Sequence, residues 1–135
     1  MEQIAVIGAG SWGTALAILL CGNGHQVRLW GHDPGHIADL ARDRENRAFL
    51  PGPRLPDDLH PAAALEQAMA GATAVLVAVP SQFFAGIIAQ LSPLLPPHMG
   101  IVWATKPEQE FRQTNLCPHL GCRLFVIRKN GDRRL

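Results

Sequence analysis

The sequence predicts an α/β fold with a doubly wound, mainly parallel sheet. Three observations predict it. Short apolar runs typical of buried strands alternate with helix-forming segments along the chain. A glycine-rich turn follows the first of these runs directly. The composition, 135 residues with 47% hydrophobic and 17% charged residues, is that of a globular domain with its own core.

The first half of the chain predicts two strand–helix pairs. Residues 3–7 (QIAVI) form a buried apolar strand, and residues 11–21 form a helix that the glycines of 22–24 (GNG) end. Residues 26–30 (QVRLW) form the second strand. Asp33 and Pro34 supply a capping carboxylate and a first-turn proline, so we expect a second helix from there to about Arg44.

The second half predicts a further strand–helix–strand unit after a loop. We expect a proline-punctuated loop over residues 46–56 and a short helix over 62–70, entered through Pro61. Residues 73–79 (TAVLVAV) give the strongest signal for a buried strand, ended by Pro80. A helix over 82–91 and a strand over 101–104 follow.

The order of these elements predicts where a ligand binds. Parallel strands joined by helices require right-handed crossovers, and ligands of such sheets bind beyond the carboxyl ends of the strands. The candidate residues are therefore those directly after each strand, at 8–13, 31–33, 80–83 and 105–106.

The turn after the first strand, Gly8-Ala9-Gly10-Ser11-Trp12-Gly13, matches G-x-G-x-x-G. Gly8 allows a tight turn, Gly10 lets a pyrophosphate approach the backbone, and Gly13 lets the helix pack closely on the strand. The helix start offers free N–H groups and a positive dipole end to phosphates. The motif lies at the first strand–helix turn of an alternating pattern, so we predict a Rossmann-like dinucleotide site rather than a ligand-free turn.

The end of the second strand bears on which dinucleotide binds. An acid there would bind the ribose 2′-hydroxyl and repel a 2′-phosphate. The residue after the strand is Gly31, and Asp33 is expected to serve as the helix cap. Because Gly31 leaves space and His32 can donate to a phosphate or stack on adenine, we expect NADP to be tolerated beside NAD.

Several segments together resemble the N-terminal half of bacterial NAD(P)-dependent glycerol-3-phosphate dehydrogenases. They are GAGSWGTALA, GHQVRLWGHDPGHI, NRAFLPGPRLPDDLH, VLVAVPSQFF and WATK, and the resemblance runs from residue 4 to 106 without a gap. The FLPG…LP and ATK segments are more specific to that family than the glycine motif. The resemblance implies reversible reduction of dihydroxyacetone phosphate to sn-glycerol 3-phosphate for phospholipid synthesis. The implied partners are a dinucleotide and a small phosphorylated substrate.

The resemblance also implies residue roles. Ser11, Trp12 and His32 would contact the NADP or NAD cofactor, Phe83 would border the nicotinamide, and Lys106 would reach both cofactor and substrate. The position of Lys106 supports this independently, because a lysine just past a strand can neutralise a phosphate or polarise a carbonyl. The complete predicted set comprises Gly8, Gly10, Ser11, Trp12, Gly13, His32, Phe83 and Lys106 for the cofactor, with Lys106 also for the substrate.

The resemblance stops at residue 106. The family continues there with a glycine, a serine-glycine-proline loop and a helical substrate domain, whereas this chain has Pro107. Residues 107–135 carry six Lys and Arg against three Asp and Glu, while residues 1–106 carry six against eight. We therefore expect a dinucleotide-binding domain over 1–106 and a divergent basic tail over 107–135. In this reading the fold is truncated, the helical domain is absent, and CRLFVIRK forms at most an extra or edge strand.

No catalytic residue is identified. Hydride transfer to a ketone needs a proton from a positioned acid. The family's general acid/base lysine has no counterpart by motif, since Lys129 is the only lysine besides Lys106. We expect little or no turnover by this chain alone. Two alternatives stay open: a non-catalytic NAD(P)-binding module, or a fragment of an oxidoreductase like the ketopantoate reductases, against which FLPG and WATK speak.

Metal binding and nucleophilic chemistry have weak signals. Cys117, His119 and Cys122 offer three ligands without a partner pair, so we expect no metal site. Cys21, on the apolar first helix, is expected to be a small core residue, and Trp103 is expected to serve packing.

Polar residues around the second helix are expected to face solvent. His32 and His36 flank a helix start and need not share a face, so we expect unrelated exposed roles for them. Arg42, Arg44 and Arg47 alternate with acids and predict a solvated helix face.

Composition bounds the remaining function classes. A net charge of +1 gives no argument for nucleic-acid binding, and no apolar run is long enough to span a bilayer. The start lacks a secretory leader pattern and the three cysteines form no disulfide framework, so we expect a cytoplasmic protein. An apolar surface left by the absent domain predicts self-association.

Overall fold

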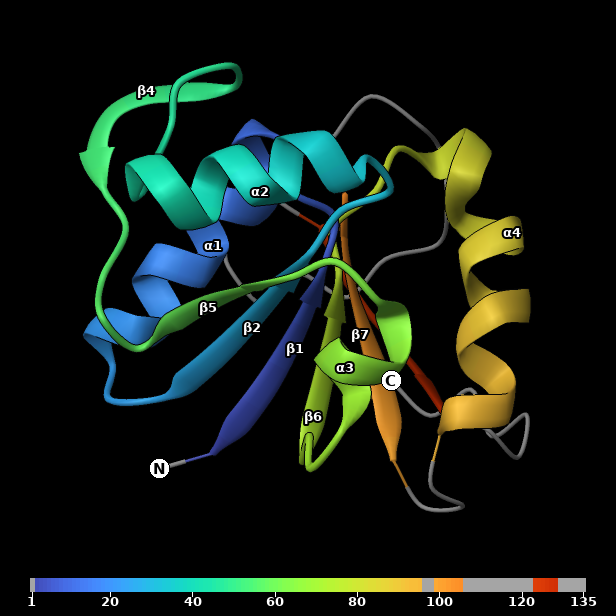
Figure 1. Ribbon diagram of the computed structural model, residues 1–135. Helices are drawn as coiled ribbons and strands as arrows, with labels where there is room; N and C mark the ends of the chain where they lie inside the picture. The colour runs from blue at the N-terminus through green and yellow to red at the C-terminus, as the bar shows by residue number, and fades with distance from the viewer. Residues whose placement is uncertain (1, 96–98, 106–122, 129–135) are drawn as a thin grey trace.

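The computed structural model describes residues 2–95, 99–105 and 123–128. Within them a six-stranded sheet has the order β5-β2-β1-β6-β7-β8 and lies between helices on both faces (Figure 1). The strands of this sheet are β1 (Gln3–Ile7), β2 (Gln26–Trp30), β5 (Leu59–Ala62), β6 (Ala74–Val77), β7 (Gly100–Thr105) and β8 (Arg123–Arg128).

Two pairs of helices cover the sheet. They are α1 (Ser11–Gly22), α2 (Pro34–Asp43), α3 (Leu65–Met69) and α4 (Ser81–Leu91), and a 3₁₀ turn at Ser92–Leu94 follows α4. Buried side chains of α1 and α2 share one apolar cluster, and those of α3 and α4 share the other. The predicted doubly wound α/β fold is therefore confirmed.

The central strand β1 shows why an unbroken apolar run forms this core. Ile4 and Val6 enter the cluster beneath α1 and α2, whereas Ala5 and Ile7 enter the cluster beneath α3 and α4. Successive residues of a strand face opposite sides, so a strand covered on both faces must be apolar throughout. All four side chains are buried accordingly.

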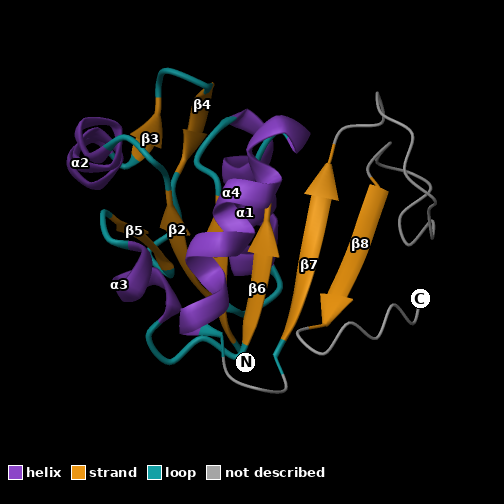
Figure 2. Cartoon of the chain, turned by 90° about the vertical axis from the view of Figure 1, so that its right-hand side faces the viewer, coloured by secondary structure: helices purple, strands orange, loops and turns teal. Residues whose placement is uncertain are grey.

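The direction of the strands gathers their carboxyl ends. β5, β2, β1, β6 and β7 are parallel, so all five end at the same edge of the sheet. β8 is antiparallel to β7, with Ile101 opposite Ile127, and it is the outermost strand on that side (Figure 2). The expected extra edge strand is confirmed over residues 123–128 of the CRLFVIRK segment.

The segment 46–56, expected to be a loop, instead forms most of a small hairpin. β3 (Glu45–Asn46) pairs antiparallel with β4 (Leu50–Arg54) through two residue pairs and an irregular register. Pro51 and Pro53 have no N–H and so weaken the strand signal, but a two-stranded hairpin leaves one side of each strand unpaired. The loop prediction was wrong for that reason.

The region around Pro61 also differs from expectation. Pro61 lies inside β5, opposite Leu29 of β2, and the helix that follows spans only Leu65–Met69. β5 is an edge strand, and an edge strand tolerates proline because one side of its backbone needs no partner. The strand β5 was therefore not predicted, and the helix predicted over 62–70 begins three residues later, at Leu65.

Candidate functional site

Gly8, at the carboxyl end of β1, is closely surrounded by backbone atoms of neighbouring segments. Its φ is +123°, and a Cβ there would lie 2.5 Å from the carbonyl oxygen of Ala78. Its N–H donates to the Trp30 carbonyl at 2.8 Å, while the Ala78 N–H donates to the Ile7 carbonyl at 2.8 Å. The ends of β2, β1 and β6 are thus held together around one glycine that no other residue can replace without strain.

The two other glycines of the motif have opposite surroundings. A Cβ at Gly13 would lie 1.8 Å from the carbonyl oxygen of Gly8, so the helix touches the loop backbone there. A Cβ at Gly10 would meet no atom within 4 Å. Folding therefore requires Gly8 and Gly13, whereas the absence of a side chain at Gly10 leaves open space above the turn.

The open space lies at the N-terminus of α1. Gly10 is the N-cap residue and no side chain caps its helix. The Thr14 N–H donates to the Gly10 carbonyl at 3.0 Å, which begins the helical pattern. The N–H groups of the first turn before Thr14 have no intrahelical acceptor, and the helix dipole adds positive potential there. An anion with several oxygen acceptors fits this arrangement.

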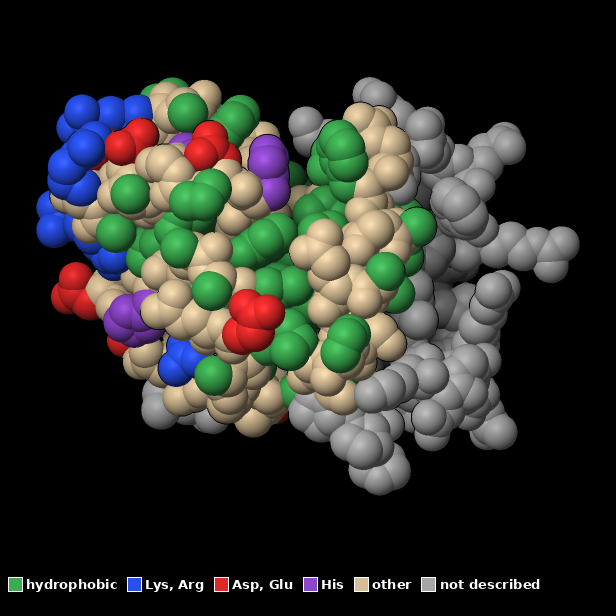
Figure 3. Space-filling view, turned by 45° about the vertical axis from the view of Figure 1, so that its right-hand side comes forward, with side chains coloured by type: hydrophobic (Ala, Val, Ile, Leu, Met, Phe, Trp, Pro, Cys, Tyr) green, Lys and Arg blue, Asp and Glu red, His purple; other side chains and the backbone are tan. Residues whose placement is uncertain are grey.

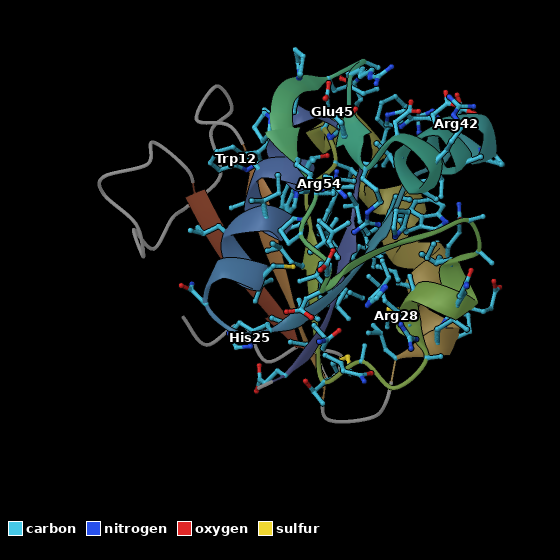
Figure 4. The ribbon with its side chains drawn as sticks, turned by 60° about the vertical axis from the view of Figure 1, so that its left-hand side comes forward. Trp12, His25, Arg28, Arg42, Glu45 and Arg54 are labelled. Atoms are coloured by element: carbon cyan, nitrogen blue, oxygen red, sulfur yellow. The ribbon has the colours of Figure 1, made fainter. Side chains whose placement is uncertain are left out.

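Trp12 adds a buried donor in the same turn. Figure 4 shows it at the N-terminal end of α1. Its side chain packs against the apolar cluster under α1 and α2. Its Nε1–H is buried and, among the described residues, has no hydrogen-bond partner. A buried donor left unpaired costs about 1–3 kcal/mol, so a ligand that brings an acceptor to it would be favoured.

The end of β2 provides the second part of the site. Gly31 is buried, and a Cβ there would lie 2.9 Å from the Cβ of Ala9. The expectation that Gly31 leaves space for a ligand was wrong, because the glycine loop fills that space. Asp33 caps α2 as predicted, accepting from the N–H groups of Gly35 at 2.9 Å and His36 at 3.4 Å. His32, between them, is exposed.

Two residues expected in solvent have structural partners instead. The Nε2 of His36 lies 3.0 Å from the Oδ1 of Asn46, and its ring meets Phe49 edge to face at 5.1 Å. Arg44 ends α2 in a left-handed conformation with φ +52° and donates to the carbonyls of Pro56 and Leu59. Sequence spacing on α2 could not predict these contacts, because all four partners lie later in the chain, within residues 46–59.

The other arginines match the predicted solvated face. Arg42 pairs with Asp39 at 3.0 Å, and Arg47 pairs with Glu45 at 3.7 Å, both arginines being about 70% exposed. The arginine side chains of the described residues gather toward one side of the molecule in the space-filling view (Figure 3).

The end of β6 forms the apolar part of the site. Phe83, in the first turn of α4, is 57% exposed. Phe84 turns inward and stacks on Trp103 of β7, with ring centroids 3.8 Å apart. Trp103 is buried and its Nε1–H donates to the Val79 carbonyl at 3.5 Å, so the expected packing role is confirmed.

Some predicted residues lie outside the described part. Lys106, Pro107 and the cysteine and histidine residues of the tail belong to it, so their roles stay predictions. Within the described residues no group of three His, Cys, Asp or Glu side chains is placed to hold a metal ion. No described helix is long and apolar enough to cross a membrane. Cys21 is buried, as expected for a small core residue. Burial raises the pKa of its thiol.

Residues 3–115 match the family model described as the N-terminus of NAD-dependent glycerol-3-phosphate dehydrogenase. The chain belongs to this family. Glycerol-3-phosphate dehydrogenases [NAD(P)+] of a Shewanella species (strain MR-4) and of Escherichia coli (strain K12 / DH10B) are each 55% identical to it over 104 residues. These residues are 77% of this chain and 31% of each relative, so the chain spans about a third of the length of the curated relatives it matches.

Solved glycerol-3-phosphate dehydrogenases have the same fold. That of Coxiella burnetii superposes with a TM-score of 0.72 at 27% identity, covering 80% of this chain and 42% of the other. That of Saccharomyces cerevisiae gives a TM-score of 0.70 at 25% identity, covering 78% of this chain and 33% of the other. The predicted resemblance to the N-terminal part of this family is confirmed, and the family model extends it to residue 115, past the predicted end at residue 106.

One polar residue at this site, Asn46, was not predicted from the sequence. Asn46 of β3 is fully buried and bonds to the glycine loop through the carbonyl of Ala9. Its sequence signal is weak, because it lies 37 residues away in a segment expected to be an irregular loop.

Proposed function

We propose that this chain binds NAD or NADP and forms the dinucleotide-binding region of a glycerol-3-phosphate dehydrogenase. The ligand's diphosphate bridge would lie over Gly10 and accept from the first-turn N–H groups of α1. The nicotinamide dinucleotide supplies or accepts a hydride when bound. From the family we expect the hydride to pass reversibly between the cofactor and dihydroxyacetone phosphate, giving sn-glycerol 3-phosphate for phospholipid synthesis.

The observation that supports the proposal best is that the three motif glycines have different steric surroundings. At Gly8 and Gly13 a Cβ would lie within 3 Å of backbone atoms, so a larger residue does not fit there. At Gly10 a Cβ would meet no atom within 4 Å. A ligand-free turn would have no need of a glycine at Gly10, where φ is −76° and a side chain has room. A phosphate group that approaches the backbone closely would need it.

The chain's own residues would divide the binding as follows. Ser11 and the Trp12 backbone would donate to the phosphates from the first turn. His32, exposed after β2, would face the adenosine end, and Phe83, exposed after β6, would present a ring face to the nicotinamide. Lys106, directly after β7, would neutralise phosphate charge near the substrate.

The proposal includes acceptance of NADP beside NAD. The acid that selects NAD in related folds bonds the ribose 2′-hydroxyl. Here the packing of Ala9 against Gly31 leaves no room for an acid at position 31, and the Asp33 carboxylate already caps α2. Similar affinities for NADH and NADPH, measured by calorimetry, are expected. A strong preference for NADH would overturn this part.

Turnover by these 135 residues is expected to be negligible. A ketone reduction needs a positioned acid, and the sequence offers none that matches the family's acid/base lysine. A steady-state assay with dihydroxyacetone phosphate and NADPH tests this, and robust turnover would contradict it. The proposal assigns cofactor binding to residues 1–106. A cytoplasmic setting, a phosphorylated substrate and self-association are further parts of it.

A matched pair of variants tests the proposal. Gly10→Ala adds a methyl group where the diphosphate would lie, and Gly22→Ala adds one at the other end of α1, where a Cβ also meets no atom within 4 Å. We expect Gly10→Ala to lose at least about tenfold in dinucleotide affinity, roughly 1.4 kcal/mol, while Gly22→Ala binds like the parent chain. Equal binding by both variants, or no heat of binding from the folded parent chain, would refute the proposal.

A further inference from the structure

Asn46 is the most connected buried polar side chain among the described residues. It is 0% exposed. Its Nδ2 donates to the Ala9 carbonyl at 3.0 Å and to Thr14 Oγ1 at 2.8 Å. Its Oδ1 accepts from the Phe49 N–H at 3.2 Å and lies 3.0 Å from the Nε2 of His36. One amide thus joins the glycine loop, α1, α2 and the β3–β4 hairpin.

The partners fix the orientation of this amide. A carbonyl can only accept and a backbone N–H can only donate, so Nδ2 must face Ala9 and Oδ1 must face Phe49. His36 must then donate from Nε2, which sets its tautomer when the ring is neutral. Two donors and two acceptor sites are all the capacity that an asparagine has, and all four are used.

The bond to Ala9 has a consequence for the neighbouring peptide. No described peptide bond is cis, so the Ala9 carbonyl and the Gly10 N–H belong to one planar trans unit and point in opposite directions. Pulling the Ala9 carbonyl toward Asn46 in the interior therefore directs the Gly10 N–H away from it. Among the described residues no acceptor satisfies this N–H.

The bond to Thr14 acts on the next part of the turn. Thr14 is fully buried, and its backbone N–H donates to the Gly10 carbonyl. Asn46 therefore bonds to the carbonyl of Ala9, which directly precedes Gly10. It also bonds to the side chain of Thr14, whose backbone N–H bonds to the Gly10 carbonyl. The peptides on both sides of Gly10 are fixed by one side chain from β3.

We propose that Asn46 is a positioning residue of the dinucleotide site, which orients the Gly10 N–H toward the ligand's diphosphate. The inference rests on the proposed dinucleotide binding. It assigns a functional role to the β3–β4 hairpin, whose first strand carries the residue that shapes the glycine loop. An aspartate in its place would put two acceptors, its carboxylate and the Ala9 carbonyl, against each other.

The variant Asn46→Asp tests this with almost no change in volume. An ionised carboxylate cannot donate to Ala9, whereas a neutral carboxyl group can donate one O–H to it. Burial raises the pKa of such a group, but the His36 ring, 3.0 Å from Oδ1, opposes this whenever it is protonated. The pH series is therefore run with His36→Gln in both the parent chain and the variant, so that falling pH restores the donor without a facing cation. We expect the NAD⁺ dissociation constant of Asn46→Asp to exceed that of the parent chain by about tenfold or more at pH 8. This ratio should fall several-fold by pH 5.5.

The comparison uses the full chain and NAD⁺, which carries no titrating 2′-phosphate, well below the unfolding midpoint of each variant. Thr14→Val removes one acceptor of Nδ2 and keeps the shape, so it should weaken binding by about threefold with no pH dependence of the ratio. Met69→Ala, in the opposite apolar cluster on α3, provides a destabilised control that should bind like the parent chain.

Amide resonances give a second measurement. In Asn46→Asp at pH 8 the ¹H and ¹⁵N shifts of Gly10 and Ser11 should move, and in Met69→Ala they should not. If the parent chain binds no NAD⁺, the proposed function and this inference fail together. If the parent chain binds and both Asn46→Asp and Thr14→Val bind equally well, the inference alone is refuted. Weakened binding by Asn46→Asp with a pH-independent ratio would also refute it.

Discussion

The two strand–helix units on either side of the sheet centre hold their shape by different forces. In the β1–α1–β2 unit, glycines bring backbone atoms into contact, and Asn46 of β3 donates to the Ala9 carbonyl and to Thr14 Oγ1. In the β6–α4–β7 unit, the Phe84 ring of α4 stacks on Trp103 of β7 within the apolar cluster under α3 and α4. The first unit is fixed by directional bonds and the second by apolar area.

This difference matches the two ends of the proposed ligand. A diphosphate needs donors fixed in direction, and hydrogen bonds with close backbone contacts provide that. A nicotinamide ring needs a flat apolar surface, and stacking tolerates small shifts of its partner. The comparison therefore predicts that substitutions in the first unit act through geometry, whereas those in the second act through buried area.

The largest expected effect is that of Gly13→Ala. Helix propensity alone would favour alanine by about 0.5–1 kcal/mol. The added Cβ, however, would lie 1.8 Å from the Gly8 carbonyl oxygen, so α1 must move off the loop. We expect a loss of about 3 kcal/mol or more in the free energy of unfolding, measured by urea denaturation.

Gly86→Ala is the matched control for that prediction. Gly86 also lies inside a helix, α4, but a Cβ there would meet no atom within 4 Å. Propensity then acts alone and should stabilise the chain by about 0.5–1 kcal/mol. If the two variants change stability in the same direction, close contact at Gly13 does not decide the outcome.

The second effect in size belongs to Phe84→Ala. The Phe84 ring is half-buried and stacks on Trp103 with an interplanar angle of 18°. Its truncation should cost about 2 kcal/mol, below the range for fully buried phenylalanine. The emission of Trp103 should shift to longer wavelength in the folded state. Unchanged stability would show that buried area does not hold the β6–α4–β7 unit.

Parts of both units could be predicted from the sequence, for local reasons. Continuous apolar runs at 3–7 and 73–79 predicted buried strands, and Asp33 with Pro34 predicted the start of α2, because these signals depend on neighbouring residues only. β5 and the hairpin were not predicted because their prolines weaken the local strand signal. These short strands form through hydrogen bonds to a neighbouring strand, which the local sequence does not reveal. Asn46 was missed because its partners come from three other elements.

The third effect is that of Asp33→Ala, which removes the cap of α2. Its carboxylate accepts from the N–H groups of Gly35 and His36. The loss should be about 1 kcal/mol in unfolding free energy. Asp33→Asn keeps an acceptor at the cap and should retain most of the stability, so a large loss in that variant would argue against capping as the role. Both can be measured by thermal unfolding.

The smallest effect on stability is expected at Phe83, the neighbour of Phe84 in the sequence. Its ring is 57% exposed, so Phe83→Ala should change the unfolding free energy by less than about 0.5 kcal/mol, in contrast to Phe84→Ala. If the ring borders the nicotinamide, the variant should bind NAD⁺ about threefold more weakly, a stacking contribution of roughly 0.6 kcal/mol. Binding of ADP-ribose, which lacks the nicotinamide, should not change. Equal weakening for both ligands would place Phe83 away from the ring and break the division between a polar and an apolar half of the site.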